Sequence, residues 1–180
     1  MVYLYNECIK LFGSHYALMQ AIANKKIFKI KDGLYSTNKN EKELAIFVKE
    51  HMGAVFTLES AFYYYGMSDV IPDKYVVATD KDASKYNKQN VKQYFMNNGL
   101  INIGVTSIKY LDTTIPIFDK ERLLIELIRY KNKLPFDYYK EIINYYRNHI
   151  SEISITTILD YLESFPKKEL ITRTLQMEVL

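Results

Sequence analysis

Seven side chains near the N-terminus have the chemistry needed to contact a nucleic acid. Four are lysines, whose ammonium groups can neutralise phosphates: Lys25, Lys26, Lys29 and Lys31. Three precede them at the spacing of one helix face, from which side chains can reach base edges: Tyr16, Met19 and Gln20. The pattern favours polynucleotide contact, although two lysines on a strand are also common on a solvated face.

A helix followed by a tight hairpin is predicted to position these residues. Ser14 is a favourable N-cap, because its side-chain oxygen can accept hydrogen bonds from the free amides of the first turn. The apolar residues of the helix recur at helical spacing and are expected to pack inward: Ala17, Leu18, Ala21 and Ile22. From Ile27 the period changes to two, and Asp32-Gly33 is typical of a two-residue hairpin turn. Lys29 and Lys31 are therefore expected to share a face of the hairpin.

The charge distribution agrees with this location. The whole chain of 180 residues has a formal net charge of +3. Residues 1–40 contain six lysines against Glu7 and Asp32, a balance of +4, so the remainder sums to −1. A local basic excess is the footprint of phosphate contact.

Composition places the chain among folded proteins of a reducing compartment. Hydrophobic residues make up 48% and charged residues 25%, which excludes a disordered chain. With Cys8 as its one cysteine, the chain cannot form an internal disulfide. It has neither an apolar run of membrane-spanning length nor the features of a signal peptide. We therefore expect a cytoplasmic location and no membrane partner.

The remaining pattern predicts an α+β fold with two parts. Residues 2–12 are expected to form a helix that packs under the next one, and the polar stretch 37–43 is expected to be a linker. The predicted domains are a small winged-helix unit, 1–40, and a mixed-sheet α/β domain with a helical C-terminal part, 41–180. Short strands are expected in that second domain at 54–56, 75–79, 93–95, 101–105, 107–111 and 115–118. Helices are expected at 42–52, 58–65, 120–130, after Pro135, at 155–162 and at 167–178.

The helix that begins after Asp119 carries a structural motif of three residues. Asp119 is its predicted N-cap, and Glu121 lies favourably in the first turn. We expect Arg122 to pair with an acidic group or with carbonyls around the helix start, because an unpaired charge in a packed domain is costly. The two carboxylates should diverge, so they do not predict a catalytic pair. With no metal-spaced His/Cys cluster and no phosphate-cradling glycine loop, neither an enzyme nor a cofactor is expected.

Four motifs in sequence together resemble one protein family. KIFKIKDGLYS, FTLESAFYYYG, PDKYVVAT and IFDKERLLIELIR occur here in the order found in AbiEi-type antitoxins, over roughly residues 10 to 180. Those antitoxins are the DNA-binding partners of nucleotidyltransferase toxins in abortive-infection (type IV toxin–antitoxin) systems. The resemblance implies an N-terminal winged helix that binds operator DNA and represses its own operon, and a C-terminal domain that supports toxin neutralisation in phage defence.

Two functions are therefore carried forward. In the first, the chain is an antitoxin and transcriptional autorepressor, with Tyr16, Met19 and Gln20 contacting bases and the four lysines holding phosphates. A homodimer on DNA is an expectation for a protein of this kind, but the sequence defines no dimer surface. In the second, the N-terminal unit, in which only two helices are predicted before the wing instead of the usual three, does not bind DNA. The protein is then an interaction module that sequesters a toxin or another partner.

Overall fold

The computed structural model describes residues 1–97 and 99–180, and these residues group into two compact units. Unit 1 comprises Met1–Met52 together with Leu111–Thr114, and unit 2 comprises Gly53–Tyr110 and Ile115–Leu180. Both units contain helices and a sheet, so the predicted α+β class is confirmed. The units are described separately below.

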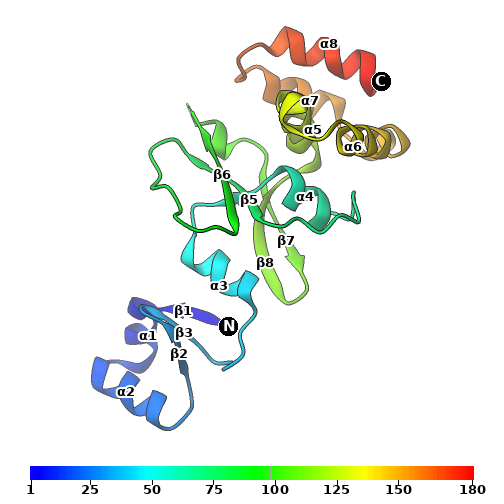
Figure 1. The fold of residues 1–180 in the computed structure, drawn as a ribbon. Coiled ribbons are helices and arrows are strands. Elements are labelled where there is room, and N and C mark those ends of the chain that lie inside the picture. The colour runs from blue at the N-terminus through cyan, green and yellow to red at the C-terminus, as the bar shows by residue number, and fades with distance from the viewer. Residues whose placement is uncertain (98) are drawn as a thin grey trace. The chain divides into compact units, whose positions relative to one another are not determined.

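Unit 1 is built from a three-stranded sheet and three helices (Figure 1). In chain order its elements are β1 Val2–Leu4, α1 Tyr5–Phe12, α2 His15–Ala23, β2 Phe28–Lys31, β3 Leu34–Ser36 and α3 Glu43–Glu50. The strand order is β1-β3-β2, and both neighbours of β3 run antiparallel to it. The last strand therefore lies between the first two.

Strand β1 corrects the prediction of one helix over residues 2–12. Val2 pairs with Ser36 and Leu4 with Leu34, and the helix begins only at Tyr5. Apolar residues at 2–4 fit either period, and the unpaired edge of β3 decides between them because it supplies the hydrogen bonds of a ladder. The start of α1 is then fixed by Glu7, whose Oε2 accepts a hydrogen bond from the Leu4 amide at 2.7 Å.

The predicted helix and hairpin are confirmed in their boundaries. Ser14 caps α2 by accepting a hydrogen bond from the Ala17 amide at 3.1 Å. Lys31 pairs with Leu34 across the turn, in which Gly33 has φ +77°, a value that favours glycine. A bulge lies between Lys29 and Lys31, however, and it interrupts the alternation from which their shared face was predicted.

The core of unit 1 lies between the two helices and the sheet. Cys8 and Leu18 are fully buried, and Ile27 is buried beside them after α2 ends. The unit continues past the predicted boundary at residue 40 to Met52 and includes α3, which packs beside β1. α3 is therefore the third helix of this unit.

Unit 2 contains a five-stranded mixed sheet with strand order β6-β5-β4-β8-β7. Its strands are β4 Val55–Phe56, β5 Tyr75–Asp80, β6 Val91–Met96, β7 Val105–Tyr110 and β8 Thr113–Phe118. β5 is antiparallel to β4 and parallel to β6, while β4 is parallel to β8. β4, only two residues long, therefore joins the two halves of the sheet.

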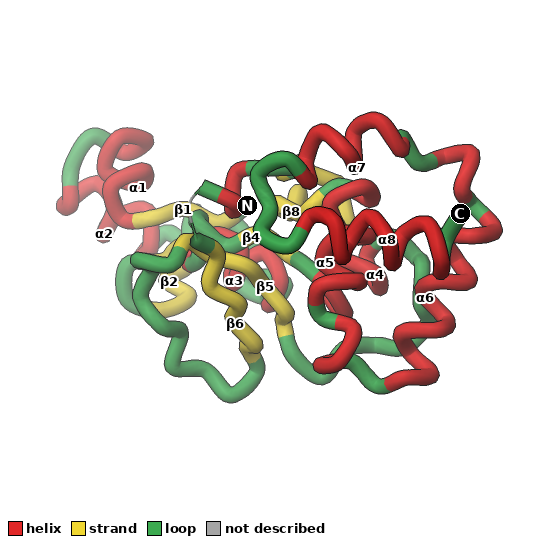
Figure 2. The backbone as a smooth tube through the Cα atoms, turned by 90° about the horizontal axis from the view of Figure 1, so that it is seen from above, coloured by secondary structure: helices red, strands yellow, loops and turns green. Residues whose placement is uncertain are grey.

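Helices α4 to α8 accompany this sheet. Their bounds are α4 Leu58–Tyr64, α5 Lys120–Arg129, α6 Phe136–Asn148, α7 Ile155–Leu162 and α8 Lys168–Glu178. α5 packs against α4, α7 and α8, and helices α5 to α8 gather at one side of the strands (Figures 1 and 2). Three short 3-10 helices complete the unit, at Leu100–Asn102, Lys131–Lys133 and Ile150–Glu152.

The predicted strand at 101–105 is wrong. Residues 100–102 form a 3-10 turn that starts after Gly99, which has φ +73°. Leu100 and Ile101 bury their side chains from this turn. The apolar residues were correctly predicted as core, but two consecutive buried side chains do not require a strand.

Candidate nucleic-acid interface

Helix α2 presents the predicted base-contacting residues to solvent. Tyr16 is 74% exposed and Met19 50%, and Gln20 is exposed beside them. Gln20 Nε2 donates to Tyr16 Oη at 3.3 Å, so the two side chains lie along the same face. On the opposite face Leu18 is fully buried in the core of unit 1. The predicted inner and outer faces are both confirmed, whereas contact with bases remains a prediction.

Lys25 and Lys26 follow directly on the C-terminal end of α2. Their amides donate to the carbonyls of Ile22 and Ala21, at 3.0 and 2.9 Å, and hold the chain against the helix end. Both lysines are exposed, and neither makes an ion pair with another described residue. The partial negative charge of the helix end favours cations here. Their charges are thus available to an incoming anion.

The two hairpin lysines are held by acids of unit 1. Lys29 Nζ lies 2.6 Å from Asp32 Oδ1 in the turn, and Lys31 Nζ lies 2.5 Å from Glu50 Oε2 of α3. The hydrogen bond from Lys29 lowers the pKa of the Asp32 carboxyl and raises that of the lysine. The prediction of two free phosphate contacts on one face is therefore corrected: each lysine already has a partner.

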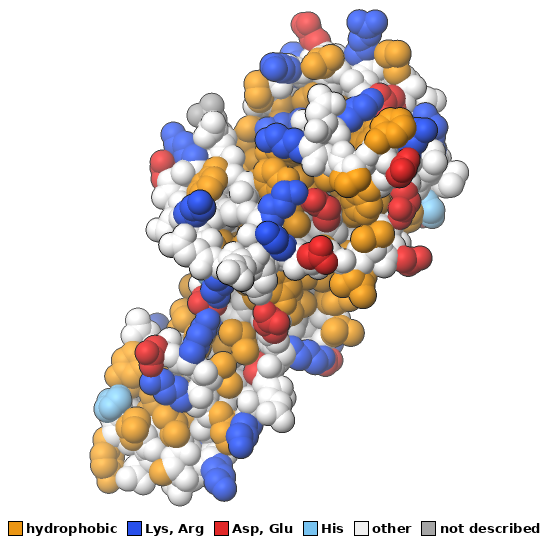
Figure 3. Space-filling view, viewed as in Figure 1, with side chains coloured by type: hydrophobic (Ala, Val, Ile, Leu, Met, Phe, Trp, Pro, Cys, Tyr) orange, Lys and Arg blue, Asp and Glu red, His pale blue; other side chains and the backbone are white. Residues whose placement is uncertain are grey.

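The two ion pairs differ in how easily they can open. The Asp32 side chain is 99% exposed, so solvent screens its pair with Lys29. Glu50 is only 26% exposed, and Lys31 reaches it across to another element. A phosphate can therefore displace Asp32 from Lys29 more readily than Glu50 from Lys31. In Figure 3 the visible face of unit 1 carries lysine and hydrophobic side chains together.

The predicted structural motif at the start of α5 holds helices together in unit 2. Asp119 Oδ1 accepts from the Arg122 amide at 2.7 Å, and its Oδ2 accepts from the Tyr161 hydroxyl at 2.8 Å. Glu121 instead accepts a hydrogen bond from the Ser154 amide at the start of α7. Burial raises the pKa of Asp119, an effect that its two hydrogen bonds oppose. The two carboxylates therefore serve different partners, as their spacing predicts.

Arg122 is fully buried and completely partnered, as expected. Its Nη2 lies 2.8 Å from Glu126 Oε1, and its Nη1 donates to the carbonyls of Leu100 and Ile103 at 2.7 and 2.9 Å. The acid is one turn further along α5 rather than at the helix start. The guanidinium also lies between two aromatic rings, 4.4 Å from Phe118 and 4.5 Å from Phe165. Burial lowers the pKa of Arg122, and Glu126 opposes that change.

Sequence reasoning missed a pocket in unit 2. Its walls come from α4, from residues 70–76, from β6 and from the start of α6, and its first and last lining residues, Glu59 and Glu141, lie 82 positions apart. No local pattern brings such segments together, so the sequence carries no direct signal for it. The single available hint was the run of apolar residues at Val70 and Ile71, outside any predicted element.

Two searches for other kinds of site gave no candidate. Among residues 1–97 and 99–180, no three His, Cys, Asp or Glu side chains are grouped so that they could hold a metal ion. Within the same ranges, no helix has both the length and the apolarity that spanning a membrane requires. In comparisons with known proteins, no family model and no curated protein matches this chain.

Proposed function

We propose that unit 1 is a winged helix-turn-helix that binds duplex DNA, with α2 in the major groove and the β2–β3 hairpin as its wing. The order of its parts supports this proposal: strand, two helices, then a hairpin whose second strand pairs with the first. In such units the second helix reads base edges and the hairpin contacts the adjacent backbone. The observation that carries the proposal is the solvent-exposed row on α2, formed by Tyr16, Met19 and Gln20.

The electrostatics favour a specific division of labour in this interface. Lys25 and Lys26 contact phosphates directly, because no acid within residues 1–97 and 99–180 pairs with them. Lys29 joins them when a phosphate replaces Asp32. Lys31 contributes least, because Glu50 holds it within unit 1. A positive surface of this size gives modest affinity for any duplex, so specificity must come from α2.

We further propose that the chain is the antitoxin and autorepressor of an AbiE-like operon. The basis is the resemblance of four motifs to those of the AbiEi-type antitoxins. Two of these motifs coincide with defined elements of the structure: KIFKIKDGLYS forms the hairpin of unit 1, and IFDKERLLIELIR contains the start of α5. Unit 2 would then be the part that acts against a nucleotidyltransferase-type toxin encoded next to it. Under this proposal the expected compartment is the cytoplasm, because the protein would have to meet both its operator and its toxin there.

Fluorescence anisotropy with a labelled duplex from the chain's own upstream region tests DNA binding. We expect saturable binding that a shuffled duplex of equal length competes for poorly. The double variant Lys25→Ala/Lys26→Ala should weaken binding to both duplexes and reduce the slope of log K against log salt by about 1.8, at about 0.9 per phosphate contact. Lys109→Ala removes one exposed lysine of β7 in unit 2 and is the control that should leave the slope unchanged.

A second experiment separates sequence reading from phosphate contact. The variant Gln20→Ala should lose preference for the upstream duplex while it keeps the salt slope, since base contacts carry sequence information and phosphate contacts do not. An equal loss on both duplexes would contradict the placement of α2 in a groove.

The competing function is sequestration of a protein partner without DNA binding. Two observations favour it: both hairpin lysines are already paired, and Tyr16 and Met19 form an exposed apolar surface of the kind that proteins bind. It predicts no saturable binding of the upstream duplex at any salt concentration. That outcome would replace the repressor proposal.

A further inference from the structure

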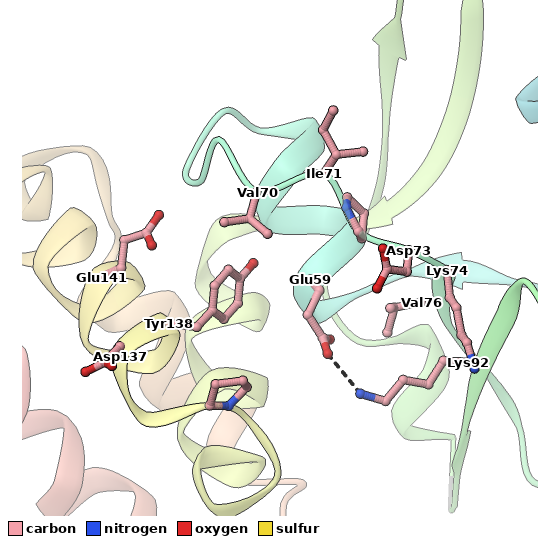
Figure 4. Close-up of a pocket in the computed structure, with 12 residues that line it drawn as sticks. Glu59, Val70, Ile71, Asp73, Lys74, Val76, Lys92, Asp137, Tyr138 and Glu141 are labelled. Carbon is pink, nitrogen blue, oxygen red and sulfur yellow. Dashed lines mark hydrogen bonds and ion pairs between the residues drawn. The ribbon is translucent and has the colours of Figure 1, made fainter.

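Unit 2 contains a pocket of about 660 Å³ whose lining combines five apolar residues, one tyrosine and six charged residues (Figure 4). The apolar lining is Val70, Ile71, Pro72, Val76 and Pro135. Val70 and Ile71 stand at the lip and are 54% and 71% exposed. The volume lies in the usual range of ligand sites, and the lining suits an aliphatic stem rather than a fully polar group.

The charged residues of the pocket are predominantly acidic. Its four carboxylates are Glu59, Asp73, Asp137 and Glu141, against two lysines, Lys74 and Lys92. Glu59 comes from α4 and Asp73 from the segment before β5, whereas Glu141 stands on α6 across the pocket (Figure 4). Lys92 is engaged by Glu59 at 2.8 Å, which leaves an excess of negative charge for an occupant to meet.

One carboxylate oxygen in this pocket lacks a donor. Glu59 Oε1 accepts from Lys92 Nζ, but Glu59 Oε2 is buried and has no hydrogen-bond partner among the described residues. A buried carboxylate oxygen without a donor is energetically unfavourable, so a turn of the Glu59 side chain that brings this oxygen to a ligand N–H in the pocket would be stabilising. Beside it, burial and then the charge of Glu59 raise the pKa of Tyr138, which keeps that phenol a neutral hydrogen-bonding group.

We propose that this pocket binds an arginine side chain in a segment of a partner protein, with apolar residues on either side of the arginine. The aliphatic part of the side chain would lie on Val76 and Pro72. The guanidinium would donate to Glu59 Oε2 and to a second carboxylate, that of Asp73. Arginine fits better than lysine because its fork of N–H donors can serve two acceptors at once. The exposed Val70 and Ile71 are the reason for a protein segment: a small free cation would leave them uncovered.

This proposal does not depend on DNA binding, because every residue of the pocket belongs to unit 2. Methyl NMR of the full chain, with labelled valine and isoleucine, tests it with the blocked tripeptide acetyl-Leu-Arg-Leu-amide as the probe. We expect saturable shifts of the methyl groups of Val70, Ile71 and Val76. Glu59→Gln preserves shape and should raise Kd about tenfold, the effect of losing a charge-assisted hydrogen bond.

Two further variants serve as a second test of the charge requirement and as a control. Asp73→Asn changes an exposed residue outside the sheet, so it should change stability by less than about 0.5 kcal/mol, and it should raise Kd as well. Glu169→Gln, on the exposed surface of α8, is the matched control and should leave Kd unchanged.

Three outcomes would overturn the proposal. Equal binding of acetyl-Leu-Glu-Leu-amide would show that charge has no part in it. Butylguanidinium binding as tightly as the tripeptide would replace the protein segment with a small cation. Absence of saturable shifts would refute the site itself. None of these results bears on the anisotropy measurements with DNA, so each proposal can fail separately.

Discussion

Replacing Arg122 with methionine should destabilise unit 2 by about 4 kcal/mol. The change leaves the carbonyl of Ile103 without its Arg122 donor, a loss of about 1–3 kcal/mol, whereas the carbonyl of Leu100 keeps the amide of Ile103 at 3.4 Å. Glu126 keeps a second partner, Arg129 Nη1 at 2.6 Å, so its carboxylate is not left uncompensated. Losing the charge-assisted hydrogen bonds from Arg122 to Glu126 costs a further roughly 1.5–3 kcal/mol, so the two losses together come to about 4 kcal/mol.

Urea unfolding of the full chain measures this loss. The chain contains 17 tyrosines and no tryptophan, so tyrosine fluorescence and far-ultraviolet circular dichroism are the two probes. With a slope of about 2 kcal/mol per molar, a loss of about 4 kcal/mol lowers the midpoint of unit 2 by about 2 M. Arg122→Lys keeps the charge but not the planar fork of donors, so it should fall between wild type and Arg122→Met.

The control is Arg173→Met, which removes an exposed arginine from α8 and should change stability by less than about 0.5 kcal/mol. A loss below about 1 kcal/mol in Arg122→Met would refute the reasoning, because it would mean that the Ile103 carbonyl and Glu126 find other donors easily. A loss shared equally by unit 1 would also refute it, since the interactions of Arg122 lie in unit 2.

Three smaller perturbations test other features. Gly104→Ala should lower the free energy of unfolding of unit 2 by about 3 kcal/mol in urea, because residue 104 has φ +68° and the new Cβ would lie 2.6 Å from a neighbouring side-chain carbon. Gly99→Ala, at φ +73° but in open space, should cost clearly less, and equal costs for the two variants would exclude the clash. The Cys8 thiol, fully buried and with its pKa raised by that burial, should react with Ellman's reagent only as fast as unit 1 opens; rapid reaction of the native chain would contradict its burial. Asp32→Asn should release Lys29 in the free protein and strengthen binding to the upstream duplex in anisotropy titrations, because the phosphate no longer has to displace a carboxylate; unchanged affinity would mean that Lys29 touches no phosphate.

Local pattern was sufficient where one element decides its own geometry. The spacing of apolar residues in α2 predicted which side of the helix is buried, and Ser14 and Asp119 predicted where two helices begin. These features depend on residues within one or two turns of each other. They can therefore be predicted from the local sequence.

Features that depend on distant partners could not be predicted in the same way. Strand β1 forms because β3, about 30 residues later, offers it an edge. Lys31 forms an ion pair with Glu50, which lies outside the predicted unit of residues 1–40. The pocket unites Glu59 with Glu141. In each case the deciding residue lies in another element, and only the tertiary fold brings the two together.

The short strand β4 has a consequence for how unit 2 assembles during synthesis. Phe56 pairs with Val77 on one side and with Ile117 on the other, so the chain between Phe56 and Ile117 must be complete before the sheet can close. Such non-local pairing slows folding, because loop-closure entropy is lost before the contacts are gained. We expect a ribosome-bound chain to hold residues 1–52 in folded form while β4 still lacks β8, its neighbour from later in the chain.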